Sequence, residues 1–317
     1  MTAVSSGHHP FEQFKKVELE SSRLNLDPHI LFICGGEVDV KQMDTLSLRE
    51  RFFESFDEHG YPTYHDSCIR AETFKDYHET GQYKDLAAFE NDLAHIASLL
   101  VIFLESAGSI VELGLFSANE MLRKKLLVVV NQKHHNNDSF IKLGPLATLR
   151  RANKDSVCVY PWELHNPAGI SKDDLGFIFE DVNSALSKID ATIKFDKDDP
   201  GHICFLIYEV IRIYRALRIG EIRKLLSFHG IEIDNVRINN FIYLLSISEY
   251  VKEENLGRDT FYVCVKSFKK IKYKSKDLSD RFDDNSMFLE SSIFYSREES
   301  EKRRHRIIEM NTTPEGV

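Results

Sequence analysis

The sequence predicts an α/β protein in which a doubly wound parallel sheet is followed by a smaller domain of short helices and a β-hairpin. Three observations support this prediction. Nearly continuous apolar runs alternate with helical patterns between about residues 29 and 160. Runs without polar alternation are typical of strands covered on both faces, and strand–helix alternation requires parallel pairing through right-handed crossovers. Beyond residue 201 the pattern changes to short helices.

The length and net charge of the chain limit the number of domains and the kinds of partner that it can have. A chain of 317 residues is long enough for two domains. Its net charge of −9 argues against a surface that coats nucleic acid generally, although a local basic patch remains compatible. We predict an N-terminal arm (1–28), a sheet domain (29–195), a smaller helical domain (202–276) and a polar tail (277–317).

Cysteine usage and hydropathy indicate the environment. The five cysteines are dispersed without a C-x-x-C pair, which disfavours a disulfide framework or a zinc site and fits a reducing cytoplasm. No metal is therefore expected. No apolar run approaches the roughly 20 residues that a membrane-spanning helix needs, so we expect a cytoplasmic protein without a membrane partner.

The sheet domain begins with the strand pattern at 29–34 and closes with an amphipathic helix at 172–194. Between these ends, apolar runs and 3.6-residue periodicity alternate. The further predicted strands are 61–65, 99–104, 126–131 and 156–160, and the predicted helices are 45–58, 84–97, 109–124 and 138–149.

A charged turn at 195–201 ends in Pro-Gly and reads as a linker. After it we predict a helix at 202–216, two short helices at 219–230 and 235–246, and a hairpin at 249–265. Helix, short helix, short helix, hairpin is the order of a winged helix-turn-helix domain. We also predict a loosely held helix at 298–310, within the polar tail.

In residues 266–276, lysines lie before, between and after aromatic residues, and the segment contains no acidic residue. This pattern favours contact with phosphates, and the alternative is a solvated strand face. In the helix at 235–246, one face could meet a nucleic-acid groove or be plain surface. The predicted partner contacts are Arg237, Lys269, Lys270, Lys272 and Lys274, with Asn239, Asn240 and Tyr243 beside Arg237.

Two carboxylates follow the strand at 99–104. Glu105 ends the strand, and Glu112 lies one turn into the next helix, after Gly108 and Ser109. Ligands of open α/β sheets bind at the carboxyl ends of strands, so this segment predicts a functional site. Two alternatives remain open: Ser109 and Glu112 can form a capping box, and Glu105 can be a solvated loop acid.

A glycine pair, Gly35–Gly36, follows the first strand. Such a pair lets the backbone approach a sugar or phosphate with its N–H groups exposed, although an ordinary tight turn explains it equally well. Neither the G-x-G-x-x-G fingerprint nor a P-loop is present. We therefore predict substrate contacts at Gly35, Gly36, Gly108 and Ser109.

A carboxylate beside glycines at a strand end suits glycosidic chemistry, since it can attack or stabilise an anomeric carbon as a base departs. Glu112 is the better nucleophile because the start of a helix can position it. Glu105 is then the group that orients a ribose hydroxyl or handles protons.

These motifs together carry a resemblance. Cys34-Gly-Gly-Glu37, Glu105-Ser-x-Gly-Ser109 and Glu112-Leu-Gly114 resemble the nucleoside 2-deoxyribosyltransferase-like fold. More closely, they resemble the toxic effectors of retron antiphage systems, and the similarity covers roughly residues 30–160. The winged-helix order of the C-terminal region agrees with those effectors.

The resemblance implies an N-glycosidase toxin with Glu112 as the catalytic carboxylate and NAD as substrate, cleaved at the nicotinamide–ribose bond without a further cofactor. It also implies self-association, and silencing by a reverse transcriptase and its branched RNA–DNA product. Ser98 stands where the transferases often carry Asp, which puts base exchange in doubt. The alternatives are transfer or hydrolysis on nucleosides or deoxynucleotides, and a nucleotide-sensing transcriptional regulator.

Overall fold

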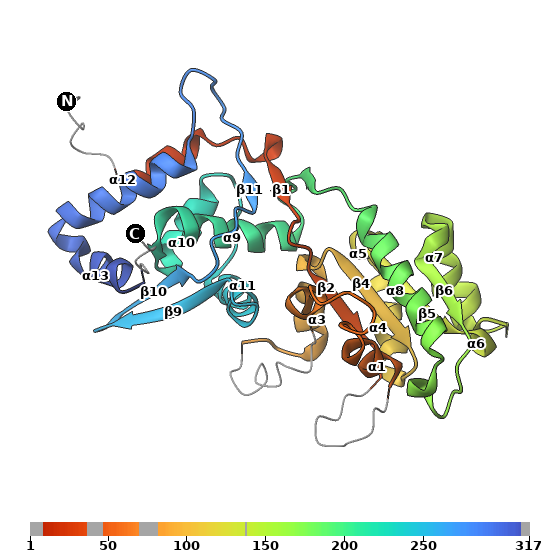
Figure 1. Ribbon diagram of the computed structural model, residues 1–317. Coiled ribbons are helices and arrows are strands. Elements are labelled where there is room, and N and C mark those ends of the chain that lie inside the picture. Colours follow the sequence, from red (N-terminus) through yellow and green to blue (C-terminus); the bar gives the residue numbers. More distant parts are fainter. Residues whose placement is uncertain (1–8, 37–46, 70–81, 137, 312–317) are drawn as a thin grey trace. The chain divides into compact units, whose positions relative to one another are not determined.

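The computed structural model describes residues 9–36, 47–69, 82–136 and 138–311 (Figure 1). They divide into two compact units. The sheet unit contains the described residues within 28–80 and 84–191. The helical unit contains those up to residue 27, residues 82–83 and those from 192 onward.

The sheet unit is built on five parallel strands in the order β3-β2-β4-β5-β6, which confirms the predicted sheet. Leu31 pairs with Leu99, Leu100 with Leu126, and Val128 with Val157. Every residue of β2, β4 and β5 is buried, as strands covered on both faces require. The strands are β2 (Leu31–Cys34), β3 (Cys68–Ile69), β4 (Leu99–Leu104), β5 (Leu126–Asn131) and β6 (Val157–Tyr160).

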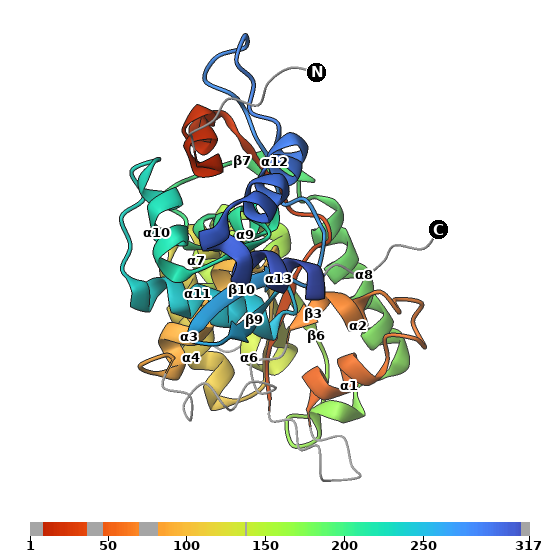
Figure 2. The same ribbon diagram turned by 90° about the vertical axis from the view of Figure 1, so that its left-hand side faces the viewer.

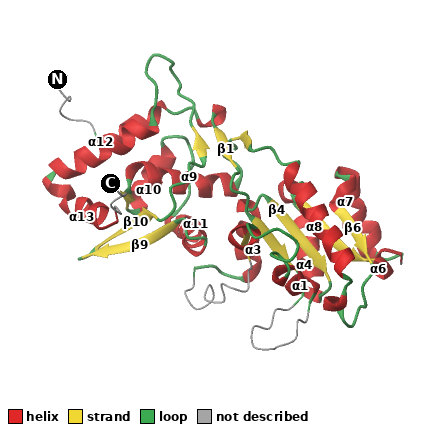
Figure 3. Cartoon of the chain, in the orientation of Figure 1, coloured by secondary structure: helices red, strands yellow, loops and turns green. Residues whose placement is uncertain are grey.

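Helices cover the two faces of this sheet (Figure 3). On one face α1 and α8 pack Phe52 and Phe179 against Phe103 of β4. On the other, Phe116 of α4 contacts Phe32 of β2. The helices are α1 (Leu48–Glu54), α2 (Tyr64–Ser67), α3 (Leu86–Ile96), α4 (Ala107–Ala118), α5 (Glu120–Arg123), α6 (Gln132–Asn136), α7 (Ala147–Ala152) and α8 (Lys172–Ser187), with short turns at Lys142–Leu146, Lys154–Ser156 and Pro167–Gly169.

The predicted strand at 61–65 is wrong. Tyr61 and Tyr64 stack on one another with ring centroids 5.1 Å apart, and Tyr61 also stacks on Phe179. A spacing of three residues brings two rings together in a turn or helix, so the aromatic pattern belongs to the turn before α2. The strand that pairs with β2 begins later, at Cys68.

Three predicted helices also have different limits. The helix at 109–124 is split at Asn119, whose side chain accepts N–H groups of Met121 and Leu122 and starts α5. The region 138–149 contains a π-helical segment at Lys142–Leu146 before α7. The closing helix ends at Ser187, and residues 192–194 form a strand of the helical unit.

The helical unit is arranged around α9 (Pro200–Tyr214) (Figure 2). Nearly every residue of α9 is buried. Its element order after α9 is strand, helix, helix, hairpin, and the hairpin pairs with β8 in an antiparallel sheet ordered β8-β10-β9. The elements are β8 (Ala216–Leu217), α10 (Ile219–Ser227), α11 (Asn235–Ile247), β9 (Val251–Leu256) and β10 (Asp259–Cys264).

Both predicted ends of the chain are folded into this unit. Near the N-terminus, Phe11 and Phe14 pack against Tyr214, and β1 (Arg23–Asn25) pairs with β7 (Thr192–Lys194) and β11 (Ile271–Lys272). The predicted polar tail contains α12 (Asp284–Arg297) and α13 (Lys302–Asn311), which bury Tyr295 and Ile307. Within the described residues, no helix has the length and apolarity to span a bilayer.

Candidate active site

Glu105 joins three segments at the carboxyl edge of the sheet. Its Oε1 accepts the backbone N–H groups of Gly36, at 2.9 Å, and Arg49, at 3.0 Å. Its Oε2 accepts the N–H of Leu48 at 2.7 Å. The carboxylate therefore ties the ends of β2 and β4 to the first turn of α1, whose N-terminal N–H groups need acceptors. The alternative of a solvated loop acid for Glu105 does not hold, because both carboxylate oxygens accept backbone N–H groups.

The glycine pair is required by packing. A Cβ on Gly35 would lie 2.8 Å from the Cβ of Arg49, and one on Gly36 would lie 2.7 Å from the Cβ of Ser47. The Gly36 N–H is donated to Glu105, and the guanidinium of Arg49 donates to the Gly36 carbonyl. The expectation that the Gly36 N–H faces a ligand is therefore wrong. The pair lets α1 approach β2 closely.

Opposing effects act on the Glu105 carboxyl. Burial raises the pKa of Glu105 above its ordinary value, and the N–H groups of Gly36, Arg49 and Leu48 offset only part of that rise. Because both oxygens accept N–H groups, the ionised form fits this geometry. Such a carboxylate organises its surroundings and is poorly placed to exchange protons with a substrate.

The start of α4 settles the capping alternative. Ser106 is the N-cap and forms a capping box with Ser109, so the alternative of a capping box between Ser109 and Glu112 does not hold. Ser109 is fully buried, and its Oγ accepts the N–H groups of Glu105 and Ser106. Its contacts belong to the helix terminus, where Ser106 Oγ also donates to the Gly35 carbonyl at 3.0 Å.

Glu112 is the sixth residue of α4 and does not take part in the cap. Its side chain is half-buried, with Oε2 in the interior, and the buried Leu113 follows it. Gly108 lies exposed in the first helical turn. The described part of the site thus joins Gly35, Gly36, Glu105 and Ser109 in one hydrogen-bonded cluster at the strand edge from which the helix carrying Glu112 begins.

Arg49, Ser47 and Ser106 are contributors that the sequence prediction missed. Ser47 caps α1 by accepting the Glu50 N–H, and Ser106 caps α4. A serine directly before each helical pattern is a usable signal for both caps. Nothing in the sequence marks Arg49, because its contact with Gly36 depends on how α1 returns to β2.

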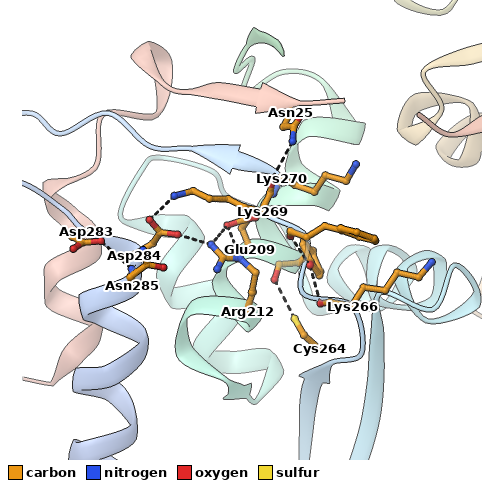
Figure 4. Close-up of polar contacts among 12 residues, drawn as sticks. Asn25, Glu209, Arg212, Cys264, Lys266, Lys269, Lys270, Asp283, Asp284 and Asn285 are labelled. Carbon is orange, nitrogen blue, oxygen red and sulfur yellow. Dashed lines mark hydrogen bonds and ion pairs between the residues drawn. The ribbon is translucent and has the colours of Figure 1, made fainter. Parts of the chain in front are cut away.

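The lysine segment 266–276 is not a uniform basic strip (Figure 4). Lys270 is only 1% exposed, and its Nζ donates to the carbonyl of Asp27. Lys269 forms an ion pair with Asp284 at 2.6 Å. Lys272 and Lys274 are exposed. Of the four lysines predicted to contact phosphates, Lys270 lies in the interior of the helical unit, whereas Lys269 is exposed and joins the same network through its ion pair with Asp284.

That network is centred on Glu209, which is fully buried. Glu209 accepts the backbone N–H of Lys270, and Arg212 bridges Glu209 at 2.8 Å and Asp284 at 2.7 Å (Figure 4). Burial raises the pKa of Glu209, which Arg212 opposes, and burial lowers the pKa of Lys270 to about 8.

The predicted groove-reading face of α11 is partly covered. The Tyr83 hydroxyl donates to the Asn240 carbonyl at 3.2 Å, and its ring lies edge-on to Tyr243, with centroids 6.2 Å apart. Arg237 stacks over the Phe241 ring. The adjoining hairpin carries Glu253 and Glu254. Covered side chains and nearby acids do not favour a phosphate backbone at this face.

The sequence of this chain is similar to proteins of one family. The model of the family described as STM3845 retron effector protein matches residues 45–253. A candidate ribosyltransferase/DNA-binding protein of Escherichia coli retron Ec73 is 27% identical over 215 residues, which cover 62% of this chain and 65% of that protein. Its counterpart from Escherichia coli retron Ec86 is 35% identical over 127 residues, 40% of this chain and 39% of that protein.

The aligned segments thus span less than two thirds of either relative's own length. The family match is broader in this chain, because it covers more than half of the residues and runs from just before α1 of the sheet unit to β9 of the helical unit. The chain therefore belongs to the STM3845 retron effector family.

Proposed function

We propose that this retron effector is an N-glycosidase that hydrolyses NAD at the nicotinamide–ribose bond, with Glu112 as its catalytic carboxylate. The observation that carries the proposal is the division of labour between the two acids. Glu105 is held by backbone N–H groups, whereas Glu112 lies outside the cap, on the helix that begins at the same strand edge. The curated relatives, named as candidate ribosyltransferases, support chemistry at a ribose carbon.

One catalytic carboxylate suits this substrate. The nicotinamide of NAD is a pyridinium, so the electron pair of the breaking C–N bond neutralises it and no acid has to protonate it. Glu112 would stabilise or bond to the ribose C1′ as positive charge develops there. Water then attacks C1′ and loses a proton, giving nicotinamide and ADP-ribose. A nucleoside base departs less readily without protonation, and the bound Glu105 is poorly suited to supply it.

A substrate panel tests this proposal. The full chain is incubated separately with NAD and with a mixture of deoxynucleosides, and released bases are identified by chromatography and mass. We expect nicotinamide from NAD and no free base from deoxynucleosides. Free adenine or cytosine instead would favour the alternative of a nucleoside hydrolase or deoxyribosyltransferase.

We also propose that the helical unit is a winged-helix domain through which a reverse transcriptase and its branched RNA–DNA product hold the enzyme silent. The observed order of helices and hairpin and the family membership support this proposal. Among the predicted phosphate contacts, Lys272 and Lys274 are exposed and lie outside the ionic network around Glu209. Replacing both with Gln should weaken binding of the RNA–DNA product and reduce its salt dependence, and unchanged binding at low salt would exclude them.

Self-association of the sheet unit is a further part of the proposal. Exposed apolar side chains on α4, Val111 and Leu115, lie beside Glu112 in sequence, and a second copy could cover them. Sedimentation of the full chain measures this directly. A monomer at concentrations where the enzyme is active would contradict it.

A further inference from the structure

A cavity in the sheet unit lies at the opposite edge of the sheet from Glu105. It has a volume of about 590 Å³ and is bounded by the starts of β4, β5 and β6 and by the last turns of α8. Because these strands are parallel, their amino ends share one edge and the loop carrying Glu105 starts at the other. None of the predicted active-site residues lines this cavity.

Charge in the cavity is predominantly positive. Its walls carry four lysines against two aspartates. Both aspartates already have partners: Asp155 pairs with Lys188 at 2.8 Å, and Asp181 accepts the Tyr160 hydroxyl at 2.6 Å. Four positive and two negative charges leave an excess of two, which matches the dianion of a phosphomonoester. The lysines are Lys124, Lys125, Lys154 and Lys188.

Two of these lysines are best placed to hold an anion. Lys125 donates to the His95 carbonyl at 2.8 Å, and Lys188 is paired with Asp155. Lys124 and Lys154 are exposed side chains that approach from neighbouring strand starts. An ammonium on a flexible stem is a common phosphate ligand.

The remainder of the wall indicates the organic part of the ligand. Leu127, Val157 and Ile189 supply apolar surface, and Asn153 and Ser184 supply polar groups. Among the described residues that line the cavity, none is aromatic, so a base would find no stacking platform. The volume lies within the range of roughly 300–1,000 Å³ that small-molecule sites occupy.

We propose that this cavity is a binding site for a small phosphomonoester, with Lys124 and Lys154 holding the phosphate and the apolar wall covering a sugar. It is separate from the proposed glycosidase site and does not depend on that activity. The shared chemistry is the phosphomonoester, which a sugar phosphate or a nucleoside monophosphate could supply.

Calorimetric titration of the full chain tests the proposal with four probes: inorganic phosphate, ribose 5-phosphate, adenosine 5′-monophosphate and adenosine. We expect ribose 5-phosphate to bind more tightly than phosphate, and adenosine not to bind. The double variant Lys124→Gln/Lys154→Gln should raise the dissociation constant at least tenfold. The control Lys84→Gln/Lys172→Gln removes two exposed lysines elsewhere in the sheet unit and should leave it unchanged.

Amide hydrogen exchange locates the bound probe. Protection by ribose 5-phosphate should appear in residues 153–158 and 184–189, and it should persist in Glu112→Gln. Protection confined to 105–116, or equal binding by the Lys124→Gln/Lys154→Gln and control variants, would overturn the proposal. Absence of saturable binding by all three phosphate compounds at millimolar concentration would overturn it as well. Tighter binding of adenosine 5′-monophosphate than of ribose 5-phosphate would overturn the assignment to a sugar.

Discussion

Two glutamates, the partly buried Glu105 and the fully buried Glu209, organise the two units by different means. Glu105 is satisfied by three backbone N–H groups from the sheet unit. Glu209 lies in an ionic network with Arg212, Lys269 and Asp284. A carboxylate bound by backbone dipoles fixes loop geometry, whereas one paired with a buried cation makes each partner's burial depend on the other. Removing one partner of the buried ion pairs in the helical unit should therefore destabilise the protein far more than removing one partner of Glu105.

The largest effect is expected for Arg212→Met. This change leaves Glu209 and Asp284 without their shared cation, and breaking a buried pair costs about 3–5 kcal/mol. Urea unfolding followed by far-UV circular dichroism should show an early transition of the helical unit. Trp162 fluorescence, which reports the sheet unit, should change little.

A matched control is Arg223→Met, which removes an exposed arginine of α10 in the same unit. It should change stability by less than about 0.5 kcal/mol, as surface substitutions generally do. Equal effects of the two substitutions would show that the ionic network does not stabilise the helical unit.

Burial of Lys270 should make the stability of the helical unit increase with pH in the alkaline range. Its pKa is lowered to about 8 in the folded protein, so the unfolded chain binds more protons between pH 8 and about 10.5. Stability should therefore rise with pH in this window, by about 2 kcal/mol between pH 7 and 10. The difference in unfolding free energy between the unmodified protein and Lys270→Met isolates the effect. A difference independent of pH would contradict it.

Glu105→Gln should have a comparable or smaller effect, confined to the sheet unit. An amide nitrogen in place of one carboxylate oxygen faces a backbone N–H, which costs about 1–3 kcal/mol. Amide exchange across 47–54 should accelerate as the start of α1 loosens. Glu120→Gln, an exposed acid at the start of α5, serves as control. Unchanged amide exchange across 47–54 in Glu105→Gln would show that Glu105 does not hold the start of α1 in place.

The smallest effect concerns the N-terminal segment. The His229 Nε2 lies 3.0 Å from the Phe14 carbonyl oxygen, and burial lowers the His229 pKa to about 4. The unfolded chain therefore binds more protons between pH 4 and 6.5, and stability falls as pH drops through this window. Since the ring is partly exposed, screening reduces the loss to about 1 kcal/mol at pH 5.

His229→Gln retains an N–H donor but does not titrate. The difference in unfolding free energy between the unmodified protein and this variant should therefore shrink from pH 7.5 to pH 5. A constant difference across that range would show that His229 protonation does not weaken the helical unit.

Local pattern predicted the sheet well because its strands are apolar throughout. The predicted limits of β4 and β5 are those observed, and both carboxylates follow β4 as expected. The strand at 61–65 failed because Tyr61 and Tyr64 owe their spacing to packing on Phe179. A local pattern cannot show a partner more than a hundred residues away.

Partners that are distant in sequence also explain why the candidate site residues were only partly predicted. The importance of Glu105 was visible from its place at a strand end, but its partners Leu48 and Arg49 come from another helix. The lysine segment looked uniformly basic because its neighbours Asp284, Glu209 and Asp27 are distant in sequence. Burial of Lys270 follows from the tertiary fold alone.

The proposed role of Glu112 in NAD hydrolysis is tested by measuring nicotinamide release from NAD by the full chain and by two single variants. We expect release by the unmodified protein and by Glu120→Gln, and a rate at least a hundredfold lower in Glu112→Gln, with all three proteins folded to the same stability. Release by Glu112→Gln at the rate of Glu120→Gln would contradict the assignment of Glu112 as the catalytic carboxylate.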